Sequence, residues 1–161
     1  MKKQKGFTLV EMLIYMGLMA GFLLVLTDVL VAILDVKAES AATSSVQTDG
    51  RFITARLAYD VALATSISQP ATLGASGGTL TMVVGGNTYT YSLNGTNLQL
   101  VNNLGTNNLN SSESQVSGLT FQRLGNTGGK DTIKVTYTLT SATTRVAGSE
   151  VRTFTTTVGR R

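Results

Sequence analysis

The chain falls into three stretches that differ in the spacing of their apolar residues. Residues 7–34 form an almost continuous apolar run of Leu, Val, Met, Ile, Phe, Ala and Gly. From Thr79 onward, apolar and polar residues alternate in short segments, which is the period of β-strands. Between these two stretches, apolar residues recur at the spacing of one helix face: Val46, Ile53, Leu57, Val61 and Ala64. This order predicts an α+β protein in which one long helix precedes a β-rich domain.

The predicted helix covers residues 7–66, a length of about 90 Å at 1.5 Å per residue. Pro70 limits it, because a helix usually stops before the residue that precedes a proline. Gly50 lies on the apolar stripe, and the small, polar segment Ser40–Thr48 is the part that we expect to kink or fray. Three charged residues fall mostly off the stripe, two of them at the i,i+4 spacing of a helical ion pair: Arg51, Arg56 and Asp60.

Turn residues divide the C-terminal part into short strands. Gly85-Gly86-Asn87 is a hairpin signal between two alternating segments. The expected strands are Thr79–Val84, Thr88–Leu93, Leu98–Leu100, Leu119–Phe121, Ile133–Leu139 and Phe154–Val158. Residues 102–117 and 140–148 are polar and are expected to be surface loops, the first being the place to look for a partner-specific surface. The strands predict a twisted, mainly antiparallel sheet with one face on the second half of the helix.

Composition excludes several kinds of chemistry. The chain has no Cys and no His, so Cys/His metal sites, His-based catalytic triads and disulfides are excluded. Only carboxylates in or beside the predicted loops remain as candidates for acid–base chemistry: Glu113, Asp131 and Glu150. We expect these to be scattered surface acids, and we expect no catalytic site, metal or cofactor.

The net charge of +4 is concentrated at the N-terminus. Lys2, Lys3 and Lys5 lie in the first six residues, and 10 basic and 9 acidic residues remain after them. The remaining cations are scattered rather than gathered in a basic stripe, so direct nucleic-acid binding is not expected. Lys-rich flanks of a membrane helix stay in the cytoplasm, which predicts an N-terminus inside and residues after about 34 outside.

The apolar run of residues 7–34 contains two formal charges, Glu11 and Asp28. The uncharged stretch Met12–Thr27 covers about 24 Å, less than the roughly 30 Å of a hydrocarbon core. With Asp28 at the outer boundary, Glu11 lies about one turn inside the inner boundary. Three interpretations compete: a secretory signal peptide, a plain membrane anchor that tolerates Glu11 near the headgroups, and a helix whose Glu11 has a charged partner. No small-x-small cleavage site closes the run, which disfavours the first interpretation.

The segment Lys5-Gly6-Phe7-Thr8-Leu9-Val10-Glu11-Met12-Leu13 resembles the cleavage and methylation site of type IV prepilins and type II secretion pseudopilins. The resemblance implies that a prepilin peptidase cuts after Gly6 and that the new terminal residue, Phe7, is N-methylated. It also implies that Glu11 of one subunit attracts the terminal amine of a neighbour, a pairing that is favourable in a low dielectric. The motif covers about residues 2–25, and the pilin plan of a long helix packed on a sheet extends the resemblance to the predicted fold.

The resemblance divides the chain into a leader (1–6), a transmembrane assembly helix (7–34), an extracytoplasmic continuation of the helix (35–69) and a β-rich domain (70–161). It implies three kinds of partner: the prepilin peptidase, other pilin or pseudopilin subunits, and an inner-membrane assembly platform. The lack of Cys differs from many major pilins, which close a loop with a disulfide, and fits minor pilins and pseudopilins. The stretch 48–67 resembles the corresponding part of J-type minor pseudopilins.

Two further features of the apolar run stay open. Gly17 and Gly21 form a G-x-x-x-G pair that allows close approach of a second helix, although glycines are common in membrane helices by chance. The leading hypothesis is a filament subunit of pilus biogenesis, type II secretion or DNA uptake. The alternative is a single-pass anchor carrying an adhesin or binding module, for which Glu11 would have no role.

Overall fold

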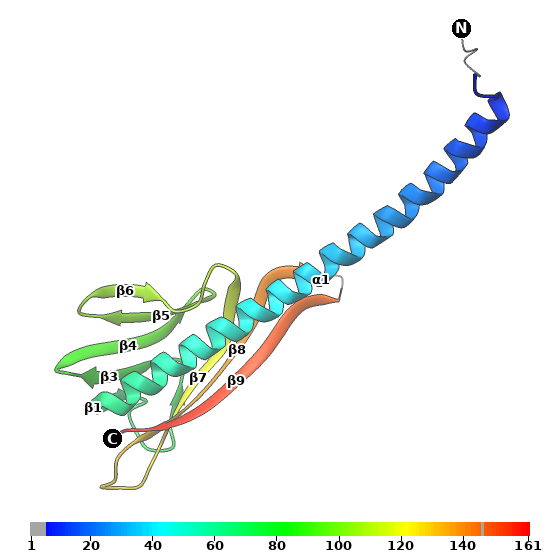
Figure 1. Cartoon of the computed structure of the whole chain (residues 1–161). Helices are drawn as coiled ribbons and strands as arrows, with labels where there is room; N and C mark the ends of the chain where they lie inside the picture. The colour runs from blue at the N-terminus through cyan, green and yellow to red at the C-terminus, as the bar shows by residue number, and fades with distance from the viewer. Residues whose placement is uncertain (1–5, 146) are drawn as a thin grey trace. The chain divides into compact units, whose positions relative to one another are not determined.

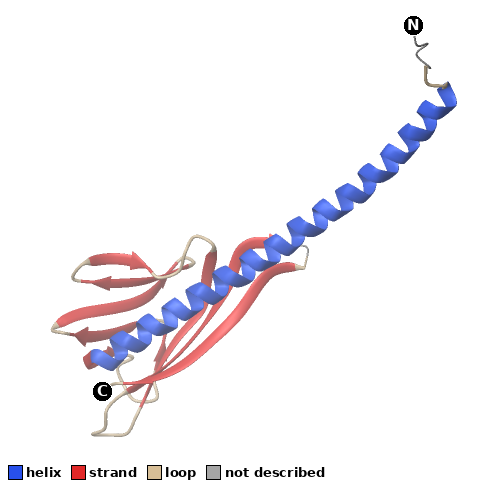
Figure 2. Ribbon diagram, in the orientation of Figure 1, coloured by secondary structure: helices blue, strands red, loops and turns tan. Residues whose placement is uncertain are grey.

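The computed structural model describes residues 6–145 and 147–161, and it contains one long helix followed by nine strands (Figures 1 and 2). The helix, α1, is Leu9–Leu63. The strands are β1 (Ala64–Gln69), β2 (Ser76–Gly77), β3 (Leu80–Val84), β4 (Asn87–Asn94), β5 (Asn97–Asn102), β6 (Gly105–Asn108), β7 (Ser114–Leu124), β8 (Thr132–Arg145) and β9 (Gly148–Gly159). The predicted α+β, pilin-like layout is confirmed. The chain forms two compact units, residues 1–37 and residues 38–161.

The strands form two antiparallel sheets rather than the single sheet that the sequence predicted. The first has the order β1-β3-β4-β5-β6 and the second has the order β2-β7-β8-β9. The β3–β4 hairpin closes through Gly85 and Gly86, whose φ angles of 57° and 81° are the left-handed values that a type I′ turn requires. This confirms the hairpin predicted from the glycine pair.

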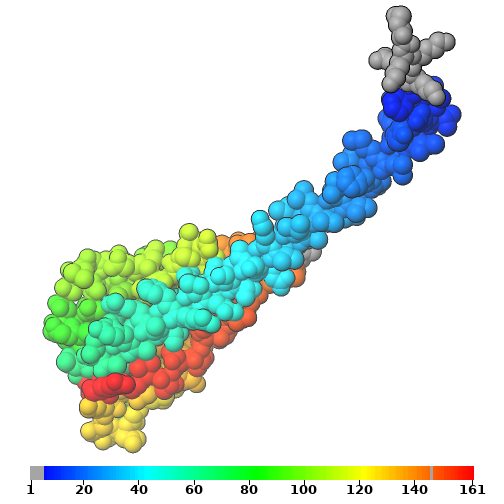
Figure 3. All heavy atoms as spheres, in the orientation of Figure 1, coloured from blue at the N-terminus to red at the C-terminus, as the bar shows by residue number. Residues whose placement is uncertain are grey.

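Figure 3 shows the second half of α1 lying against the β-rich part. This half of the helix and both sheets bury one common core. Every residue of the predicted helical stripe is buried, with 3% or less of its surface exposed. The strands contribute alternate residues, so that Ile133, Val135, Tyr137 and Leu139 of β8 all point inward and are fully buried. A helix or strand that packs against the rest of a domain has apolar residues on its packed face, so the spacing of these residues in the sequence predicted the core.

The helix ends at Leu63, before the predicted end at residue 66. Residues 64–69 instead form β1, which pairs antiparallel with β3 and buries Ala64 and Ile67. The expected continuation of the helix through residue 69 is therefore wrong. The β-branched Thr65 and Ile67 favour an extended backbone, and the edge of β3 supplies the hydrogen bonds that a further helical turn would have made. The segment Ser40–Thr48, by contrast, stays helical.

The two predicted loops are also largely strands. Residues 102–117 contain β6, which is exposed along its whole length, and the start of β7. Within residues 140–148, β8 runs to Arg145 and β9 begins at Gly148. The prediction failed because these segments are rich in Asn, Ser and Thr and lack a clear apolar alternation, whereas backbone pairing with neighbouring strands places them in the sheets.

Asp60 is buried, with 2% of its surface exposed, although the stripe placed it mostly outside the core. Its carboxylate accepts a hydrogen bond from the hydroxyl of the fully buried Tyr91. The Arg56 guanidinium donates to the same oxygen over 2.8 Å, which confirms the i,i+4 pair. Burial raises the pKa of Tyr91, and the neighbouring Asp60 carboxylate adds to this shift because it opposes a second negative charge. The carboxylate is therefore held inside by two polar partners.

Gly50 lies where α1 approaches the second sheet most closely. The Tyr137 hydroxyl donates to the Gly50 carbonyl oxygen over 2.8 Å, and the Phe154 ring stacks on the Tyr137 ring with their centroids 5.4 Å apart. A Cβ atom at position 50 would lie 2.2 Å from the tip of the Phe154 ring. The apolar stripe therefore needs a residue without a side chain at this point.

We expect Gly50→Ala to destabilise the fold, although alanine favours helix by roughly 1 kcal/mol over glycine. Displacing a stacked ring from a packed site costs about 1–3 kcal/mol, which outweighs that gain. Thermal unfolding of the full chain in detergent measures the balance. Gly50→Ala combined with Phe154→Ala is the control, because removing the ring removes the clash. An unchanged or raised melting temperature for Gly50→Ala alone would contradict the close packing.

Candidate processing and assembly site

Thr8 starts α1 as its N-cap. Its hydroxyl oxygen accepts a hydrogen bond from the Glu11 backbone N–H over 3.3 Å, and its carbonyl oxygen accepts one from the Met12 N–H over 3.2 Å. Thr8-Leu9-Val10-Glu11 is the T-x-x-E pattern of a capping box. Gly6 and Phe7 precede the cap as irregular, exposed backbone. The Gly6–Phe7 bond therefore lies outside the helix, in irregular and exposed backbone.

Glu11 lies in the first turn of α1, on the same helix face as Tyr15. The Tyr15 hydroxyl donates to the Glu11 carboxylate over 3.4 Å, and the Tyr15 ring meets the Phe7 ring edge-on at 6.1 Å between centroids. Among residues 6–145 and 147–161, no cation forms an ion pair with Glu11. The positive end of the helix dipole favours a carboxylate here, but it does not neutralise the charge. Among the described residues, the Tyr15 hydroxyl is therefore the side-chain partner of this carboxylate.

Glycine at positions 6, 17 and 21 is not required by the packing of the chain itself. A Cβ atom added at any of the three meets no atom within 4 Å. Gly17 and Gly21 are four residues apart and therefore lie on one face of α1. The structure leaves both open to the approach of another helix, while their role in assembly stays a prediction.

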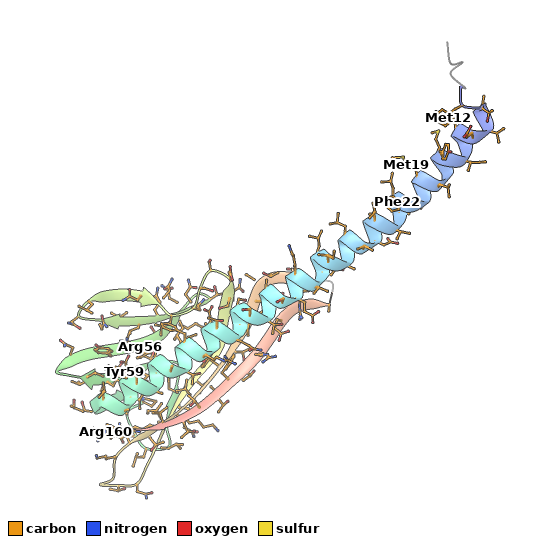
Figure 4. The ribbon with its side chains drawn as sticks, in the orientation of Figure 1. Met12, Met19, Phe22, Arg56, Tyr59 and Arg160 are labelled. Carbon is orange, nitrogen blue, oxygen red and sulfur yellow. The ribbon has the colours of Figure 1, made fainter. Side chains whose placement is uncertain are left out.

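The apolar residues of the N-terminal part of α1 are exposed around the whole helix. Met12, Met19 and Phe22 point away from the helix in Figure 4, each with more than half of its surface exposed. By length and composition, α1 can cross a membrane, and no residue of its most apolar window is buried. Asp28 and Asp35 are exposed on this part of the helix. An apolar surface of this extent is stable only in lipid or against other proteins.

The carboxylates of the β-rich part do not form a common site. Asp131 lies between two cations, with the Arg123 guanidinium at 2.9 Å and the Arg160 guanidinium at 3.7 Å. Glu150 pairs with Arg145 over 3.0 Å, and Glu113 is exposed. In the part of the chain that the structure describes, no three acidic side chains are grouped as a metal site would need. The three predicted acids are thus brought to different places, two of them in ion pairs.

Residues 1–26 match the family model of the prokaryotic N-terminal methylation motif. The chain carries a prepilin-type N-terminal methylation motif. No curated protein and no solved structure gives a match to the chain. Together with the long apolar helix, the motif supports a type IV pilin-like or pseudopilin subunit with a single-pass membrane anchor. It also implies processing by a prepilin peptidase and assembly with other pilin subunits.

Sequence reasoning missed two members of this prepilin-type site. Thr8 as the helix cap was readable from the T-x-x-E spacing, and Tyr15 was readable as the i+4 neighbour of Glu11. The predicted topology residues Lys2, Lys3 and Lys5 lie outside the described residues. The roles proposed for Gly6, Phe7 and Glu11 remain predictions that the geometry accommodates.

Proposed function

We propose that the protein is a structural subunit, a minor pilin or pseudopilin, of a type IV pilus-like filament. The observation that carries the proposal is the methylation motif of residues 1–26, in which Glu11 starts an exposed apolar helix and forms no ion pair with the described residues 6–145 and 147–161. In this proposal, the filament serves pilus biogenesis, type II secretion or DNA uptake, which share the same N-terminal chemistry. The lack of cysteine supports a minor pilin or pseudopilin over a disulfide-closed major pilin.

The proposed maturation has two steps. Hydrolysis of the Gly6–Phe7 amide consumes one water and leaves a carboxylate on Gly6 and a cationic amine on Phe7. The Phe7 amine then loses a proton and takes one methyl group from a sulfonium methyl donor, which leaves as a thioether, so that the product is a positively charged secondary ammonium group. The cation then lies four residues before Glu11, and in a neighbouring subunit it supplies the counter-charge that Glu11 lacks. Because both groups lie at the edge of the hydrocarbon layer, pairing avoids an isolated charge there.

The proposed topology follows from the same segment. Residues 1–6 stay in the cytoplasm as the leader, and residues 7–34 cross the membrane. The remainder of α1 and the two sheets lie on the outer side, first at the cytoplasmic membrane and then in the filament. The peptidase, the other subunits and an inner-membrane assembly platform are the partners in this proposal.

Gly6→Val is expected to block maturation, because a β-branched side chain obstructs the close approach of a peptidase to the scissile bond. The measurement is intact-mass analysis of the chain produced with its own prepilin peptidase. The expected wild-type mass lacks residues 1–6 and gains one methyl group, while Gly6→Val keeps the full mass. Helix α1 is unaffected, since position 6 contacts nothing within 4 Å. A wild-type chain of full mass would overturn the proposal and favour a plain membrane anchor.

A further inference from the structure

A groove lies along the junction of α1 and β9 in the unit formed by residues 38–161. Its volume is about 370 Å³. The helix lines it with Gly50, Thr54, Ala55 and Ala58, and the strand lines it with Phe154, Thr155 and Thr156. β9 is the edge strand of its sheet and runs beside α1 (Figure 1), and no further strand of the described chain pairs with its outer edge. Small side chains over an aromatic floor give a surface that a helix ridge fits.

Arg51 lines the same groove and is exposed. None of the ion pairs within residues 6–145 and 147–161 includes it. The neighbouring positions on its helix face are Gln47, Thr48, Thr54 and Ala55, which carry no charge. In contrast, Arg56, which is labelled in Figure 4, lies further along the helix and forms an ion pair with Asp60. The groove therefore presents one cation with no partner in the described chain.

Asp35 is a matching anion on the other compact unit. It is exposed, it forms no ion pair among the described residues, and its i±3 and i±4 neighbours are Val31, Ala32, Ala38 and Glu39. On the same helix face, Val31 is 51% exposed, and the next residue along the chain, Val36, is 66% exposed. Val31 lies in the last turn of the proposed membrane segment, and Asp35 and Val36 lie beyond it. Outside lipid, this apolar ridge needs a protein surface to cover it.

After removal of residues 1–6, the two parts of the chain have charges of opposite sign. Residues 7–37 carry three acids and one lysine, whereas residues 38–161 carry nine basic and six acidic residues. Opposite potentials favour contact between the first unit of one copy and the second unit of another, and like potentials disfavour contact between two second units. Such a contact joins different surfaces of the two copies, so it can repeat from one copy to the next, and it generates a filament when the rotation between copies does not close a ring.

We propose that the α1–β9 groove receives the segment around Asp35 from a second copy of this chain, with the Asp35 carboxylate on the Arg51 guanidinium. This inference rests on the proposed filament function and adds a contact distinct from that of Glu11 with the terminal amine. The groove fits a helix that carries an acidic residue better than it fits an extended peptide paired with β9. The reason is that Arg51, which has no ion-pair partner among the described residues, lies on the α1 side of the groove. The ion pair sets the orientation of the bound segment, and the apolar side chains of that segment cover the Phe154 ring.

Charge reversal tests the pair. The full chain is produced together with its peptidase and without other pilin subunits. Four forms are compared: wild type, Arg51→Asp, Asp35→Arg and the double variant. Each single reversal places like charges together, and we expect the yield of sheared filaments to fall at least about tenfold. The double variant restores the attraction with reversed sign and should recover most of the yield. Lys134→Asp is the matched control, because it reverses an exposed cation outside the groove and should leave the yield unchanged.

Two further measurements separate the possible failures. Intact mass reports maturation at Phe7, and thermal unfolding in detergent reports the fold of each variant. Single reversals that mature, fold and assemble like wild type would overturn this inference alone, as would a double variant no better than the singles. Absence of maturation in the wild type would overturn the proposed function itself.

Crosslinking tests the identity of the occupant. The chain has no cysteine, so a variant carrying both Asp35→Cys and Arg51→Cys has only these two thiols. With a short bismaleimide, filaments of this variant should give a ladder of multiples of the subunit mass, and either single substitution should stop at dimers or below. Crosslinks to a protein of different mass, or none, would overturn the assignment to a second copy.

Discussion

Replacing Glu11 by leucine is expected to abolish filament assembly while leaving cleavage after Gly6 intact. In the described chain, the only polar side chain that contacts this carboxylate is the Tyr15 hydroxyl at 3.4 Å, and no cation does so. If the methylated amine of a neighbour supplies the missing charge, Glu11→Leu leaves that amine unpaired at the membrane edge. Removing one partner of a desolvated ion pair costs about 3–5 kcal/mol, which is a loss of association by roughly two to four orders of magnitude.

The measurement combines intact mass with the yield of sheared filaments. Glu11→Gln keeps the size and the helix position of the side chain, so its loss of assembly would show that charge is required. Tyr15→Phe is the matched control, since it removes only the hydroxyl hydrogen bond and should reduce assembly little. Normal filaments from Glu11→Leu would contradict the pairing, and normal surface display without filaments in the wild type would favour an anchored binding module.

The sequence predicted the helix and the core where burial dictates residue type. Val46, Ile53, Leu57 and Val61 must be apolar because one helix face is covered, and β8 alternates for the same reason. The prediction failed where main-chain pairing decides, as in β6, whose four residues, GTNN, are all exposed and carry no apolar signal. It failed again at Ala64–Gln69, since the choice between helix and strand there depends on the free edge of β3.

The candidate sites differ in the same way. The cleavage motif and the T-x-x-E cap lie in consecutive residues, so local chemistry is enough to find them. The groove could not be predicted, because it exists only where β9 lies beside α1, about a hundred residues apart in the chain. The burial of Asp60 also depends on a distant partner, as its acceptor role becomes clear only with Tyr91, 31 residues away.

The contact between Asp60 and Tyr91 gives the second large effect. Asp60→Ala should destabilise the domain by about 3–5 kcal/mol, because the fully buried Tyr91 hydroxyl loses its acceptor and Arg56 loses its counter-charge. Tyr91→Phe should cost less, about 1–3 kcal/mol, since the Asp60 carboxylate keeps Arg56. The double variant should be more stable than the sum of the two losses predicts, as an unpaired buried group is no longer left behind. Denaturant unfolding of the full chain in detergent measures all three, and strict additivity would contradict the contact.

The pH dependence provides an independent readout of the same contact. The folded state raises the pKa of Tyr91 above its ordinary value near 10, by burial first and by the Asp60 carboxylate second. Below pH 10 the tyrosine keeps its proton in both states, so stability does not depend on it. Above pH 10 only the unfolded chain releases the proton, and the free energy of unfolding falls by up to about 1.4 kcal/mol per pH unit. Tyr91→Phe should remove this part of the slope and leave any contribution of Tyr137, whose pKa burial also raises. An equal slope in the variant would mean that folding does not raise the pKa of Tyr91, and it would contradict the burial of Tyr91 beside the Asp60 carboxylate.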